Sequence, residues 1–93
     1  MEYVILNLNY TPFMRTVAEI PHSDFKITVF AWNNKYIIKL EKGNFEQTYK
    51  VSEMETSGDA DIHKLIADEN FISQAKERFK NMNQDLNGAL NRL

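Results

Sequence analysis

The chain has 93 residues, 11 basic and 13 acidic side chains, no cysteine and a formal net charge of −2 at pH 7. This length predicts one domain, residues 1–93, that folds around a single core without a metal, and the lack of cysteine excludes a disulfide framework and thiol chemistry. The mild acidity argues against a nucleic-acid footprint, and the lack of a secretory signal or a membrane-length apolar stretch predicts a cytoplasmic protein with no membrane contact.

The first twenty residues contain two apolar segments. The run from Tyr3 to Leu6 predicts a strand within residues 1–10. Residues 11–20 are compatible with two structures, because Thr11-Pro12 is typical of a helix start while the alternation from Met14 to Ile20 favours a fourth strand.

The stretch from Phe25 to Val51 predicts three antiparallel strands joined by two tight turns. Its first part alternates apolar and polar residues with the period of two that a pleated strand imposes. Asn33-Asn34 follows, and asparagine tolerates the positive φ of a two-residue hairpin turn. The resulting register pairs Ala31 with Tyr36, Val29 with Ile38, and Ile27 with Leu40 on one apolar face.

The second hairpin is expected to turn around Lys42-Gly43. This turn keeps the apolar residues on the same face, so Ile38 and Leu40 of the central strand are predicted core residues. The predicted pairs of the second hairpin are Leu40 with Phe45, Tyr36 with Tyr49, and Lys39 with Glu46.

The chain thus divides into a part that is mainly sheet, residues 1–52, an acidic connector, residues 53–60, and a helical part, residues 61–93. The predicted fold class is α+β. We expect a three- to four-stranded antiparallel β-meander packed on one face by two C-terminal helices.

Two capping sites define the predicted helices. Asp59 or Asp61 is placed to cap the first and shorter one. Asp68 begins a second site, so a long helix is expected from about Glu69 to Asn91.

The long helix carries an apolar stripe at three-four spacing, the pattern of a coiled coil. Two interpretations are open: the stripe packs entirely on the apolar sheet face, or it continues past the sheet into a helix-mediated dimer. The flanking positions from Lys76 to Arg92 show no opposite-charge scheme that would select a partner. The stripe comprises Ile72, Ala75, Phe79, Met82, Leu86, Ala89 and Leu93, and the candidate helix association residues within it are Ile72, Phe79, Met82 and Leu86.

The sheet face opposite the helices provides a second candidate interaction surface, formed by Phe30, Trp32, Ile37 and Lys39. Aromatic rings beside lysines on an open sheet also occur in proteins that bind single-stranded nucleic acid. The lysines of this face are, however, already matched by glutamates across the strands. Because the N-terminal segment is expected to join the meander near Asp24, at the end away from Trp32, we expect another chain to cover the cluster, most simply a second copy.

Catalytic and metal-binding patterns are not found. His22-Ser23-Asp24 does not predict a catalytic triad, because in an extended chain the serine points away from its two neighbours. We interpret these residues as a turn. His63, close after Asp59 and Asp61, matches neither an EF-hand loop nor a zinc helix. No catalytic residue, metal or cofactor is predicted.

The sequence therefore favours a small soluble interaction or accessory module that self-associates as a homodimer or binds another protein, rather than an enzyme. Two other functions stay open. One is a ligand- or peptide-binding module that uses the cleft between sheet and helices, and the other is single-stranded nucleic-acid binding on the outer sheet face.

Overall fold

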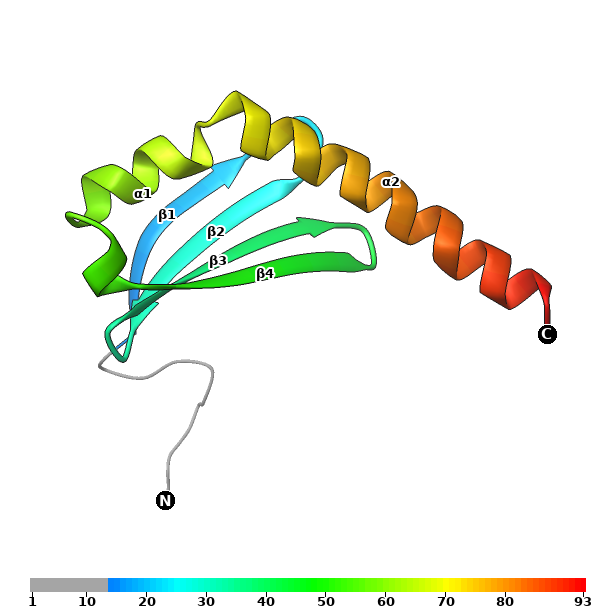
Figure 1. Cartoon of the computed structure of the whole chain (residues 1–93), viewed down its shortest axis with the longest axis horizontal. Coiled ribbons are helices and arrows are strands. Elements are labelled where there is room, and N and C mark those ends of the chain that lie inside the picture. The colour runs from blue at the N-terminus through cyan, green and yellow to red at the C-terminus, as the bar shows by residue number, and fades with distance from the viewer. Residues whose placement is uncertain (1–13) are drawn as a thin grey trace, which may run out of the picture.

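A computed structural model describes residues 14–93, which form one antiparallel sheet with two helices on one of its faces (Figure 1). This confirms the predicted α+β meander. The strands lie in the order β1-β2-β3-β4. Their bounds are Arg15–Pro21 for β1, Lys26–Trp32 for β2, Lys35–Lys42 for β3 and Phe45–Ser52 for β4. A short 3₁₀ helix, Glu53–Glu55, leads to α1, Asp59–Ile66, and α2, Glu69–Asn91. The strand predicted within residues 1–10 lies outside the described residues.

The structure decides between helix and strand for the segment before Pro21. Residues 15–21 form the edge strand β1, which pairs with β2 along its length, with Arg15 opposite Ala31 and Pro21 opposite Lys26. A bulge between Thr16 and Ala18 turns Ala18 into the core. The chain therefore enters β1 at the end of the sheet that carries Ala31. It joins β2 at the other end, through the turn that contains Asp24, so the expected junction near Asp24 is confirmed.

The first hairpin register is confirmed in every predicted pair. Asn33 and Asn34 have φ values of 55° and 63°, which is the conformation that a two-residue hairpin turn requires. The second register is wrong by two residues, since Leu40 lies opposite Gln47 and Lys39 opposite Thr48. The turn residues are Gly43-Asn44 rather than Lys42-Gly43. The first residue of this turn has a φ of 58°, which glycine adopts without strain and lysine does not. A shift of two leaves each side chain on its predicted face.

The core lies between the sheet and the two helices. Ile38 and Leu40 are fully buried, as predicted, and Ile62 and Ile66 of α1 pack against the same cluster. From α2, the ring of Phe79 lies 5.5 Å from that of Phe25. The buried cluster is Ala18, Phe25, Ile27, Val29, Ala31, Tyr36, Ile38, Leu40, Ile62, Ile66, Ala75 and Phe79.

One buried polar residue joins the sheet to α2. Gln47 lies on the inner face of β4, and its Nε2 donates to the carbonyl oxygen of Ala75 at 2.9 Å. Its Oε1 accepts from Arg78 at 3.1 Å and from the hydroxyl of Tyr49 at 3.1 Å. Since both ends of the amide have partners, this buried group carries no desolvation penalty for an unmade hydrogen bond.

The helix bounds follow the predicted capping sites only in part. Asp68 caps α2 by accepting from the backbone N–H groups of Asn70 and Phe71, as predicted. α1 begins earlier than predicted, after Gly58, which has no side-chain cap. Neither Asp59 nor Asp61 caps it. Within residues 14–93, no helix is both long enough and apolar enough to cross a membrane.

Candidate functional site

The apolar stripe of α2 is divided between two environments. Ala75 and Phe79 are buried against the sheet, and Ile72 and Met82 are partly buried there. Beyond Met82 the helix runs past the end of the sheet, as Figure 1 shows for its orange and red turns. We call residues 82–93 the projecting half of α2; this segment includes the C-cap Arg92 and Leu93, which follow the last helical residue, Asn91. The interpretation that the whole stripe packs on the sheet is therefore wrong, because the sheet covers only its first part. The helix-mediated dimer of the other interpretation stays a prediction.

The projecting half presents leucines to solvent. Leu86 is 47% exposed and Leu90 is 52% exposed. The two are one helical turn apart and therefore lie on the same side of the helix. Large apolar side chains that lie singly on a surface are ordinary, but two adjacent ones on a helix that has left its own core form an unpartnered apolar strip.

An open groove with a volume of about 1410 Å³ lies between α2 and the end of the sheet. Two turns line it, with His22 and Asp24 between β1 and β2, and residues 42–45 between β3 and β4. The helix contributes Phe79, Leu86 and Leu90. Lys76 bridges the groove where its Nζ lies 3.2 Å from a carboxylate oxygen of Asp24. The groove is therefore lined by both apolar and polar side chains of α2 and by residues of the two turns.

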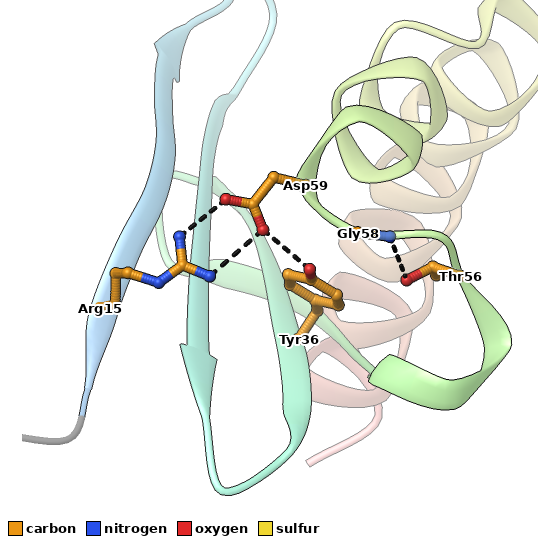
Figure 2. Close-up of polar contacts among 5 residues, drawn as sticks. All are labelled: Arg15, Tyr36, Thr56, Gly58 and Asp59. Carbon is orange, nitrogen blue, oxygen red and sulfur yellow. Dashed lines mark hydrogen bonds and ion pairs between the residues drawn. The ribbon is translucent and has the colours of Figure 1, made fainter.

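A polar cluster on the opposite end of the sheet fastens α1 to the strands (Figure 2). Arg15 of β1 donates from Nη1 and Nη2 to the two carboxylate oxygens of Asp59 at 2.7 and 3.2 Å. The hydroxyl of Tyr36 on β3 donates to the same carboxylate at 2.8 Å. The hydrogen bonds from Arg15 and Tyr36 lower the pKa of Asp59 from 3.8 to about 2. Both oxygens are engaged, so the cluster acts as a structural tie.

The hydrogen bonds of Arg15 and Tyr36 to Asp59, which we call the Asp59 tie, predict how the stability of the fold depends on acid pH. Because the folded-state pKa lies below the unfolded value, the tie stabilises the fold above pH 3.8 and is lost as the pH falls towards about 2. Asp59→Asn is expected to lower the urea midpoint at pH 7, and the gap to the wild type should close between pH 4 and pH 2. Glu55→Gln, which neutralises an exposed carboxylate nearby in sequence, is the control. Equal midpoints for Asp59→Asn and the wild type at pH 7 would contradict the role of the tie.

The outer-face residues lie together as predicted, but only one of them is well exposed. Phe30 and Ile37 face each other across β2 and β3 and are half-buried. Trp32 is 41% exposed at the end of the strand. Lys39 is partly buried, and its Nζ lies 3.7 Å from Glu46. Thr28 beside them is buried, and among the described residues its hydroxyl has no hydrogen-bond partner.

The two histidines are in unrelated places. His22 lies in the β1–β2 turn, where its Nδ1 accepts from the backbone N–H of Asp24 at 3.1 Å and its ring stacks on Phe25. His63 is exposed on α1. Asp61, two residues before His63, accepts from the backbone N–H of Ser57 at 2.7 Å. Within residues 14–93 no group of three potential metal ligands comes together.

Sequence reasoning missed the residues that organise the polar contacts. Gln47 could have been noticed as a polar residue in the inward-facing alternation of β4. Arg15 offered no such signal, because its partner Asp59 lies 44 residues away. In comparisons with protein-family models, curated proteins and solved structures, no match to this chain was found.

Proposed function

We propose that this protein is a small cytosolic interaction module that self-associates through the projecting half of α2. The observation that supports this is the exposure of Leu86 and Leu90 beyond the end of the sheet. Complete burial of a leucine side chain contributes about 1.5–3 kcal/mol, so two half-exposed leucines leave on the order of 1–3 kcal/mol per copy for association.

A second copy is the occupant that fits this strip best. It supplies the same two leucines, so one patch serves both copies, as in most two-fold dimers. The groove below Leu86 lets the end of a partner helix approach without displacing the sheet. Helix pairing over three turns buries less than the ~1,200–2,000 Å² of a standard interface, so we expect micromolar rather than nanomolar affinity.

The outer sheet face supports self-association less strongly. Of its three apolar residues only Trp32 is exposed by more than a third, while Phe30 and Ile37 are half-buried by their neighbours. Charged side chains surround them, including the Lys39–Glu46 pair and a Lys26–Glu19 pair at 3.4 Å. We therefore assign the self-association surface to α2.

Self-association through α2 is tested with two double variants, one on the leucine side of the helix and one on the opposite side. Leu86→Glu with Leu90→Glu is expected to convert a dimer into a species with the chain mass of 10.9 kDa in light scattering after size exclusion. Gln84→Glu with Asn91→Glu adds the same charge on the opposite side of the helix and should stay dimeric. Circular dichroism would show that both variants stay folded.

Three results would contradict the proposal. One is a wild-type protein that is still monomeric at about 100 µM, above the range expected for this interface. Another is a dimer that survives the two leucine substitutions. The third is a dimer that Trp32→Glu alone abolishes, which would place the interface on the outer sheet face.

A further inference from the structure

We infer that the two copies pair their projecting helices in opposite directions, so that Asp85 of each copy lies beside Arg92 of the partner subunit. This inference rests on the proposed self-association and adds its orientation and its polar contacts. The two-fold axis then passes close to Asn87 and Gly88, midway along the projecting half.

The position of the sheet excludes a parallel pairing. Pairing along the stripe requires the partner helix to lie 8–10 Å away, on the side of α2 that carries Phe79 and Leu86. Over residues 72–79 this side is occupied by the protein's own sheet. In a parallel dimer the partner's first half would need that same space. In an antiparallel dimer the partner's first half, with its sheet, lies towards the C-terminal end of α2, away from this copy's own sheet.

The apolar layers agree with an antiparallel arrangement. Met82, which is partly buried against the sheet, borders the free part of the stripe, which continues through Leu86 and Ala89 to Leu93. Antiparallel pairing about its centre puts Leu86 of one helix against Ala89 of the other, so a large side chain meets a small one in both central layers. Leu90 flanks these layers on the side of the groove.

The charges of the projecting half complete the pattern. Asp85 and Arg92 are its only charged side chains. Both are exposed, and within the described residues neither forms an ion pair. Each immediately precedes a leucine of the stripe, so the two occupy the same flanking position seven residues apart. Antiparallel helices bring these positions together across the interface, which gives two symmetric Asp85–Arg92 pairs.

Charge reversal tests the contact. Asp85→Arg and Arg92→Asp each replace two attractive pairs with two repulsive ones, and each should weaken the dimer by about tenfold at low salt. The protein that carries both changes should regain wild-type affinity. An equimolar mixture of the two single variants should form a heterodimer in sedimentation equilibrium. Equal weakening in the combined variant and the single variants would overturn the pairing.

Cross-linking tests the direction independently, because the chain has no cysteine of its own. In the antiparallel layers Met82 of one copy meets Leu93 of the other, while two copies of Leu93 lie roughly 16 Å apart along the axis. Met82→Cys mixed with Leu93→Cys should therefore form a heterodisulfide under mild oxidation, and neither variant should cross-link to itself. Self-cross-linking of Leu93→Cys would overturn the antiparallel orientation while leaving the self-association intact, whereas a monomeric wild type would overturn both.

Discussion

Replacing Ile38 with alanine is expected to lower the free energy of unfolding by about 2–5 kcal/mol. Ile38 is 0% exposed at the centre of β3 and pairs with Val29 on one side and Tyr49 on the other. It therefore packs beneath the helices with neighbours on all sides, and the loss combines the transfer term of the deleted atoms with the cavity they leave. Leu40, equally buried on the same strand, should behave in the same way.

The matched control for Ile38→Ala is Ile37→Ala, the same substitution at the adjacent residue on the opposite sheet face. Ile37 is only half-buried, so the expected loss is clearly smaller. Urea unfolding followed by far-UV circular dichroism measures both. A loss at Ile37 that equals or exceeds the loss at Ile38 would mean that the helices cover the other face of the sheet.

Replacing Phe79 with alanine is expected to lower the free energy of unfolding by about 3–5 kcal/mol. Phe79 is 2% exposed, and it is the largest buried side chain that α2 contributes to the core. Its ring contacts that of Phe25, which immediately precedes β2. Removal of the ring would leave Ala75 as the buried α2 side chain, together with the partly buried Phe71, Ile72 and Met82 and the Gln47 hydrogen bond.

Leu86→Ala is the control for Phe79→Ala, since Leu86 lies two turns further along the same stripe. Because the sheet ends before it, the expected change in the stability of the isolated chain is within about 0.5 kcal/mol. Unfolding is measured at a protein concentration low enough for the dimer to dissociate, so that only folding within one chain contributes. Comparable losses at Phe79 and Leu86 would show that the projecting half packs on the chain's own core.

The sequence by itself determined the elements that depend on neighbouring residues. The period of two along β2 and β3, with Asn33-Asn34 between them, specified both the hairpin and its register, because slipping by one residue would expose the apolar face. In the same way Asp68 and the three-four spacing after it located α2 from Glu69 to Asn91. These patterns involve residues close together in the sequence, so the elements they specify do not depend on how the rest of the chain folds.

The tertiary structure decided whatever depends on residues far apart in the chain. The β1 segment had no stronger local preference for strand than for helix, and pairing with β2 made it a strand. The Arg15–Asp59 tie exists only because the meander brings β1 beside the start of α1. The stripe of α2 is periodic from Ile72 to Leu93, and only the length of the sheet divides it near Met82 into a packed half and a projecting half. Periodicity predicts that one face of a helix is apolar, but the extent of the folded core determines how much of that face is buried.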